Sequence, residues 1–229
     1  MKIVGILGGL GPETTAHFYL DIVSLCKEAG LTERPPVLIW SIPLSYELEK
    51  RFITTGDGID GYRSFLLEGA KKLEKGGAEF IVIPCNSVHT LIEDVRKAVS
   101  VPVLSIVEET VSFLAKQNVS GIGLLATTPT LQSRLYQNFF EKNNIHLYIP
   151  PENEQIELDD LIQKLARSES GAELKQTLGT IFKNLFQKGA DALLLACTDL
   201  QLLMNNSNEN RIYDTETILA HSVVNYLRE

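Results

Sequence analysis

Short apolar runs rich in Val, Ile and Leu recur along the chain, and each is followed by a stretch whose apolar residues have helical spacing. The clearest runs cover residues 3–7, 37–40, 80–83, 121–125 and 192–195. Strands that are apolar on both faces are typical of parallel sheets covered by helices on both sides. The pattern therefore predicts an α/β fold built on mostly parallel sheets.

Two pairs of these segments resemble each other. Residues 77–86 (GAEFIVIPCN) match residues 189–198 (GADALLLACT), and residues 4–9 (VGILGG) match residues 122–127 (IGLLAT). Both pairs are separated by about half the chain and follow the same order, which indicates an internal duplication, although buried strands also resemble one another by chance. We expect two pseudo-symmetric lobes with the active site in the cleft between them. The first would comprise residues 1–100 plus 207–229, and the second residues 101–206.

Charge and composition exclude several classes of partner. The chain has 229 residues and a formal net charge of −8, and it contains no run rich in Lys and Arg. It therefore lacks the basic surface of a nucleic-acid or anionic-membrane binder. No apolar stretch approaches the roughly 20 residues that span a bilayer, and the N-terminal apolar run is too short for a signal peptide. We expect a cytoplasmic protein.

The cysteines are the first candidates for chemistry. Cys26, Cys85 and Cys197 lack the spacing of a zinc or redox centre. Cys85 and Cys197 each follow a predicted strand, at the edge where parallel sheets bind ligands, and each precedes a helical stretch. Helix N–H groups favour a thiolate, so we expect a lowered pKa for both thiols. Cys26 lies inside the helical stretch 16–29, and we expect it to be buried and inert.

If the lobes face each other, both sulfurs converge on one cleft. Two acid/base groups on opposite faces of one carbon are what stereoinversion requires, because one removes the proton and the other returns it to the far face. The pattern thus favours a racemase, with one thiolate and one thiol in the free enzyme. A Cys-His pair is the alternative. Of the four histidines, His17, His89, His146 and His221, His89 lies one helical turn after Cys85, where a packing role is equally compatible.

Four segments resemble the aspartate/glutamate racemase superfamily: residues 5–12 (GILGGLGP), 84–89 (PCNSVH), 123–128 (GLLATT) and 196–200 (ACTDL). The chain is most similar to the aspartate racemase branch, which begins with GGMGP. The resemblance implies two α/β lobes, catalysis by Cys85 and Cys197, no pyridoxal phosphate or other cofactor, no metal, and a homodimer. Leu10 replaces the Met of that motif in the substrate-binding loop, and Asp199 replaces a Glu. These departures bear on substrate range more than on reaction type.

The resemblance also implies substrate contacts. The α-carboxylate and amino group would be bound by residues of the loops that carry the motifs, namely Asn86, Ser87, Thr127, Thr128, Thr130 and Thr198, although turn and helix-cap chemistry favours the same residue types. The side-chain carboxylate would be held by two cations. Counting back from residues 70–73 (AKKL) places Arg51 at the first position, whereas counting forward from Pro43 places Leu48 there. We favour Arg51, since a buried carboxylate needs a charged donor. Arg167 occupies the second position, with Lys164 one turn earlier, and exposure to solvent is the alternative for both cations.

We therefore predict a cofactor-independent racemase of aspartate, with glutamate as the closest alternative substrate. A racemase for neutral amino acids, hydantoins or hydroxylated acids would need neither cation. A non-catalytic amino-acid-binding protein that has kept the fold is the alternative from another class, because function depends on the site and not on the fold.

Overall fold

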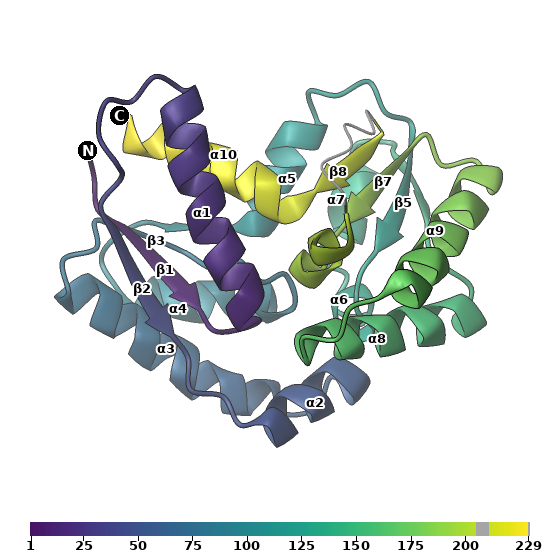
Figure 1. Cartoon of the computed structure of the whole chain (residues 1–229), viewed down its shortest axis with the longest axis horizontal. Coiled ribbons are helices and arrows are strands. Elements are labelled where there is room, and N and C mark those ends of the chain that lie inside the picture. The colour runs from purple at the N-terminus through teal and green to yellow at the C-terminus, as the bar shows by residue number, and fades with distance from the viewer. Residues whose placement is uncertain (205–210, 229) are drawn as a thin grey trace.

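The computed structural model describes residues 1–204 and 211–228, and it contains two parallel sheets of four strands each. The strand orders are β2-β1-β3-β4 and β6-β5-β7-β8, and the sheets lie side by side in Figure 1. The predicted α/β fold is confirmed. The strands are β1 (Val4–Gly8), β2 (Val37–Ser41), β3 (Phe80–Val82), β4 (Val103–Leu104), β5 (Gly121–Leu125), β6 (His146–Tyr148), β7 (Ala192–Leu195) and β8 (Ile212–Asp214).

Helices cover both faces of each sheet, because successive residues of a buried strand point to opposite sides. Ile6 of β1 packs in one apolar cluster with residues of α1, α5 and α10, while Leu7 packs in another with residues of α3 and α4. The second sheet packs against α8 and α9 on one side and α5 and α7 on the other. The helices are α1 (Pro12–Glu28), α2 (Tyr46–Thr55), α3 (Ile59–Lys75), α4 (Ile92–Ala98), α5 (Ile106–Leu114), α6 (Thr128–Gln132), α7 (Gln137–Lys142), α8 (Glu152–Ala166), α9 (Ala172–Gln187) and α10 (Thr215–Leu227).

The repeated segments occupy equivalent positions in the two sheets. Strands β1 and β5 are second in their sheets, and β3 and β7 are third, which agrees with the duplication predicted from the sequence. The short strands β4, β6 and β8 complete the two sheets and lie outside the apolar runs that the sequence analysis used. Strands of two or three residues leave too short a run to detect by periodicity unless the apolar run extends beyond the strand, as it does at β3.

The sheets divide the chain differently from the predicted lobe boundaries. Strand β4 pairs with β3 in the first sheet, although it was expected in the second lobe. Strand β8 pairs with β7 in the second sheet, although its residues were expected in the first lobe. Each of these strands forms the outer edge of the sheet that precedes it in the chain, and α10, which follows β8, then runs back beside α1, as Figure 1 shows. Residues 207–210 and 229 of the predicted first lobe lie outside the described residues.

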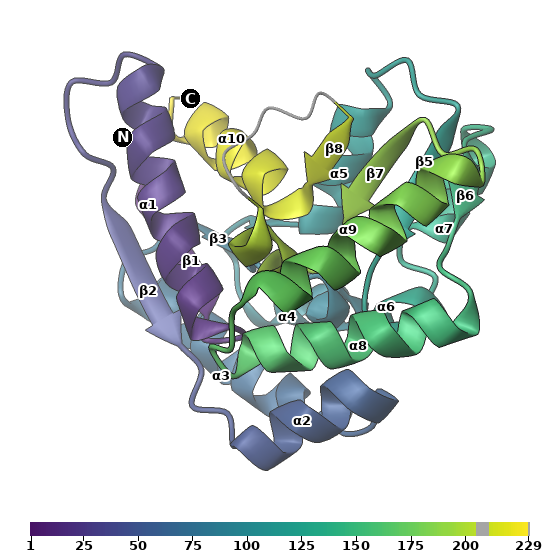
Figure 2. The same cartoon turned by 45° about the vertical axis from the view of Figure 1, so that its right-hand side comes forward.

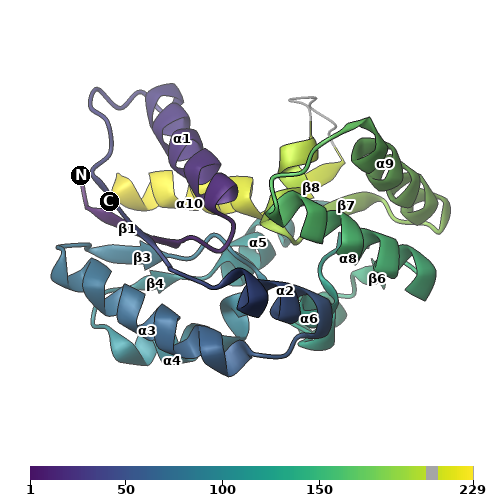
Figure 3. The same cartoon turned by 60° about the horizontal axis from the view of Figure 1, so that its bottom comes forward.

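Helix α2 connects the two halves of the molecule. It follows β2 of the first sheet but packs against α6 and α8, which belong to the second half. Figures 2 and 3 show it beneath α8 and next to α6. Its side chains therefore contribute to the space between the sheets. In residues 1–204 and 211–228, no helix is long and apolar enough to cross a membrane.

Candidate active site

Cys85 and Cys197 line one pocket between the two sheets. Each follows the third strand of its sheet and precedes a short 3-10 helix, η1 (Ser87–Leu91) or η2 (Thr198–Leu203). The equivalent positions of β3 and β7 thus bring together two thiols that are far apart in sequence. The pocket has an empty volume of about 450 Å³, its open side included, and its lining comprises Leu10, Glu49, Ile53, Tyr62, Cys85, Asn86, Ile162, Cys197, Thr198 and Asp199.

Both thiols are protonated at neutral pH in this pocket. Burial raises the pKa of Cys85 to about 11, against the opposing effects of the Ser87 hydroxyl, 3.6 Å from Sγ, and of backbone N–H groups. Burial also raises the pKa of Cys197 well above its usual value, and the Asp199 carboxylate raises it further. The predicted lowering of both pKa values is therefore wrong, because desolvation outweighs the few N–H groups of a short 3-10 helix.

His89 is a structural residue. It is buried, its Nε2 accepts a hydrogen bond from the N–H of Ile106 (3.1 Å), and its Nδ1 lies 2.7 Å from the carbonyl oxygen of Cys85. The proton must then be on Nδ1, which donates to Cys85. Burial lowers the pKa of His89 to about 4, so the ring is neutral. With both nitrogens engaged away from the thiol, the imidazole positions the Cys85 loop, and the Cys-His alternative loses its base.

The Gly-rich N-terminal loop supports the second cysteine through Asp199. The Thr14 hydroxyl donates a hydrogen bond to Oδ1 of Asp199, and a side chain on Gly11, whose φ is 110°, would place its Cβ 2.8 Å from that oxygen. Glycine is therefore required for the close approach. Burial raises the pKa of Asp199 to about 6, although the Thr14 hydrogen bond opposes this effect. Asp199, two residues after Cys197, is thus mainly ionised at neutral pH.

The polar residues after each cysteine hold the loops in place. The Asn86 amide donates to the Thr215 hydroxyl (3.0 Å) and accepts a hydrogen bond from the Tyr136 hydroxyl, so it joins the first sheet's loop to the second half. The Thr198 hydroxyl donates to the carbonyl oxygen of Pro84 at 3.3 Å. Asn86 and Thr198 nevertheless line the pocket, as does Leu10. These predicted substrate contacts lie where a ligand could reach them.

The three predicted threonines of the second half lie at the start of α6. Thr127 caps this helix, accepting from the N–H of Thr130 at 3.4 Å, and its hydroxyl lies 3.0 Å from that of Thr130. Thr128 donates to the carboxylate of Asp159 through its N–H and its hydroxyl. Within the described residues, none of the three threonines lines the cysteine pocket. Thr127 and Thr130 thus form a helix cap, Thr128 is held by Asp159, and contact of the three with a substrate stays a prediction.

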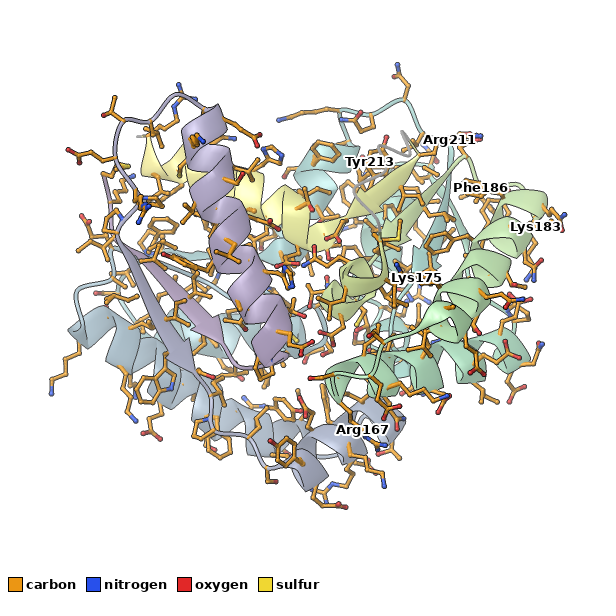
Figure 4. The ribbon with its side chains drawn as sticks, viewed as in Figure 1. Arg167, Lys175, Lys183, Phe186, Arg211 and Tyr213 are labelled. Atoms are coloured by element: carbon orange, nitrogen blue, oxygen red, sulfur yellow. The ribbon has the colours of Figure 1, made fainter. Side chains whose placement is uncertain are left out.

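The two candidate cations lie away from the thiols. Arg51 is exposed on α2, and its guanidinium lies against Gly58, as does the side chain of Leu48. Arg167 follows α8, and Figure 4 shows it beside α2, where it lines an outer cavity. Lys164 pairs with Asp160 at 2.8 Å on the surface of α8. Among the described residues, no Lys or Arg lines the cysteine pocket.

Sequence reasoning missed two groups of the pocket, the carboxyl of Glu49 and the hydroxyl of Tyr62. Burial and the nearby Asp199 raise the pKa of Glu49, and burial raises that of Tyr62. Glu49 reads in the sequence as one of two acids in the first turn of an amphipathic helix, a position that is usually exposed. Only the packing of α2 against the second half brings it to the thiols. No group of three or more potential metal ligands occurs in residues 1–204 and 211–228.

The chain belongs to the Asp/Glu/hydantoin racemase family, whose model matches residues 7–223. It is 30% identical to the broad specificity amino-acid racemase RacX of Bacillus subtilis over 227 residues, which is 97% of this chain and 96% of the relative. It is accordingly an amino-acid racemase by family, an isomerase of the cofactor-independent Asp/Glu type.

Solved structures show the same architecture. An aspartate racemase homologue from Pyrococcus horikoshii superimposes with a TM-score of 0.79 at 27% identity, covering all of both chains. An aspartate racemase from Picrophilus torridus gives a TM-score of 0.82 at 22% identity, covering 100% of this chain and 95% of the other. At 22% identity, the likeness to the Picrophilus torridus structure shows a shared fold only. Both agree with two parallel sheets flanked by helices, which the sequence predicted.

Proposed function

We propose that this chain interconverts the L and D forms of a free amino acid by a two-thiol mechanism. The thiolate of one cysteine takes the Cα proton and becomes a thiol, leaving a carbanion at Cα. The thiol of the other cysteine then gives its proton to the opposite face of that carbon and becomes the thiolate. The observation that supports this proposal is that Cys85 and Cys197 follow equivalent strands and line one pocket.

The raised thiol pKa values require that the substrate help to form the thiolate. A bound amino acid brings an α-ammonium group, and an opposite charge within about 4–6 Å favours the ionised form of a thiol. We propose that the loops after the cysteines bind the α-carboxylate, with the Ser87 hydroxyl donating to it and the Thr198 hydroxyl exchanging its bond to the Pro84 carbonyl oxygen for one to the ligand. The two thiols then titrate as one coupled system.

Aspartate, followed by glutamate, is the substrate that the motifs favour. A second candidate, a racemase with a broader substrate range, is supported by the pocket lining. Glu49 and Asp199 place two carboxyl groups beside the thiols, whereas Arg51 lies against Gly58. An acidic side chain would gain little from such surroundings.

A panel of L-amino acids incubated with the protein and separated on a chiral column tests the mechanism. We expect inversion by the wild type without added cofactor, and its loss in both Cys85→Ser and Cys197→Ser, because a serine hydroxyl stays un-ionised and is a far weaker base than a thiolate. Near wild-type inversion in either variant would exclude the two-thiol mechanism. Binding of amino acids without inversion of any would favour the non-catalytic alternative.

The family resemblance also leads us to propose a homodimer. Ile39 is 45% exposed on the edge strand β2, and Leu20 is 57% exposed on the neighbouring helix α1. Exposed apolar side chains at a sheet edge are suited to burial by a second copy. Sedimentation of the wild type and of Ile39→Lys would test this proposal, and a monomeric wild type at micromolar concentration would contradict it.

A further inference from the structure

A second, wider cavity adjoins the cysteine pocket and shares two lining residues with it. This outer cavity has an empty volume of about 1290 Å³, its open side included, and it is lined by the Gly-rich loop, by the segment that follows β2 and by the end of α8. Glu49 and Asp199 are the described residues that line both spaces. A ligand whose Cα lies between the thiols, and whose side chain extends toward the outer cavity, therefore passes these two carboxyl groups.

The charges along this route are mainly negative. The described lining of the inner pocket contains the carboxyl groups of Glu49 and Asp199 and no Lys, Arg or His side chain. The outer cavity adds Glu13 and Arg167. Two facing carboxyl groups in a partly buried space disfavour each other's ionisation, which agrees with the raised pKa that Asp199 helps to cause at Glu49. A cation between them would relieve this repulsion, and a third carboxylate would increase it.

The two acids have different surroundings. Asp199 is buried and its Oδ1 accepts the hydrogen bond of Thr14, so it is held by the N-terminal loop. Glu49 is only partly buried and extends from α2, a helix that packs against the opposite half of the molecule. Glu49 is therefore the acid that can contact a ligand's side chain, while Asp199 adds a fixed negative charge behind it.

We infer, on the basis of the racemase function proposed above, that Glu49 is a specificity residue that favours amino acids whose side chain ends in an amine or guanidine over those with a side-chain carboxylate. The length of the side chain matters as well. The reacting Cα lies at the thiols, whereas Glu49 lies where the inner pocket meets the outer cavity. Substrates of the lysine, ornithine and arginine type carry their cation at the end of a long side chain, away from the reacting Cα, and so suit a carboxyl group at that position.

Steady-state kinetics with three substrates test the inference. L-Lysine is the cationic substrate, L-methionine is a neutral one of similar length, and L-glutamate is the acidic one. We expect the wild type to have a kcat/KM for lysine at least about tenfold above that for glutamate, and Glu49→Gln to lose about tenfold or more on lysine, as for loss of a charge-assisted hydrogen bond. The methionine value should change by less than about threefold, because a neutral side chain makes no ion pair with Glu49.

Glu47→Gln is the matched control, because Glu47 is an exposed acid of the same helix that lies outside the cysteine pocket. It should leave the lysine-to-methionine ratio unchanged. Glu49→Asp should retain part of the preference, since it keeps the charge. An unchanged ratio in Glu49→Gln, or a wild type that prefers glutamate to lysine, would overturn the inference while leaving the two-thiol racemase intact.

Protection of the thiols provides a readout that does not need turnover. Alkylation of Cys85 and Cys197 by iodoacetamide, followed by mass spectrometry, should be slowed by lysine more than by glutamate in the wild type, and by a clearly smaller margin in Glu49→Gln, which still has Asp199. Glu49-dependent protection by lysine without inversion of any amino acid would support the inferred selectivity and contradict the racemase function. Equal protection by lysine and glutamate in the wild type would contradict the selectivity.

Discussion

Thr14 and Asp199 are 185 positions apart in the sequence, yet the hydroxyl of Thr14 donates a hydrogen bond to the carboxylate of Asp199. Thr14 lies in the first turn of α1, directly after the Gly-rich loop, and Asp199 follows Cys197 by two residues. The first turn of α1 in the first half thus positions an ionised group of the second cysteine loop. The pocket is therefore one unit assembled from both halves of the duplicated chain.

Asp199→Asn should make Cys197 more reactive. The Asp199 carboxylate raises the pKa of the Cys197 thiol, so removing its charge lowers that pKa and increases the thiolate fraction at a given pH. We expect the alkylation rate of Cys197 at pH 8 to rise severalfold, measured with Cys26→Ala and Cys85→Ser as the background. Thr14→Val retains the carboxylate and serves as the comparison. An unchanged or slower rate in Asp199→Asn would contradict the electrostatic coupling.

The raised thiol pKa values predict alkaline pH dependence. Burial places the pKa of Cys85 near 11, so in the free protein the thiolate fraction still rises above pH 9. We expect the rate of alkylation, and kcat/KM for racemisation, to increase steadily from pH 7 to pH 9. Rates of alkylation that level off below about pH 8 would show that the pKa values of the thiols are not raised. Urea-unfolded protein, whose cysteines should titrate near the reference value of about 8.5, is the control.

The two arginines should differ in their effects on activity. Arg51 is exposed with its guanidinium against Gly58, so Arg51→Ala should change kcat/KM for aspartate by less than about twofold. Arg167 lines the outer cavity together with Glu49, and Arg167→Ala should raise the KM for aspartate. If Arg51 instead grips a side-chain carboxylate, Arg51→Ala would lose aspartate turnover by about tenfold or more while alanine turnover changes little. The aspartate-to-alanine ratio of kcat/KM separates these outcomes.

Buried acids at the start of α10 should make the protein less stable at higher pH. Glu216 is fully buried, and within the described residues neither of its carboxyl oxygens has a hydrogen-bond partner. Burial raises the pKa of Glu216, with Asp214 adding to the effect, and burial raises the pKa of Asp214 to about 7. Both groups titrate near 4 when unfolded. The folded state therefore binds protons more tightly, and its stability should fall as pH rises from about 4 through 7 and above.

Glu216→Gln tests this pH dependence, because glutamine has nearly the same shape and carries no charge. We expect a higher Tm than the wild type at pH 8, with about 2–4 °C for each kcal/mol of stabilisation, and a smaller difference at pH 5.5. The exposed Glu33→Gln should leave Tm nearly unchanged at both values. A wild type that is more stable at pH 8 than at pH 5.5 would contradict the assignment of these acids as protonated in the fold.

The sequence by itself determined the class of fold and the two thiols. Strands β1, β2, β3, β5 and β7 were predicted because a parallel strand covered on both faces must be apolar along a continuous run, and that signal is local. The placement of Cys85 and Cys197 at strand ends is also a local property. The repeat of these segments then related the cysteines to each other, because duplicated strands take the same position in their sheets.

Only the tertiary structure decided the charges around the thiols. Desolvation depends on everything that packs around a group, so the raised pKa of Cys85 could not follow from its neighbours in the sequence. The direction of a side chain on an amphipathic helix depends on which element covers that helix. Helix α2 packs across the second half, and this turns Glu49 toward the thiols while Arg51 lies against Gly58. The inferred substrate selection rests on these long-range contacts, which neither periodicity nor motif spacing records.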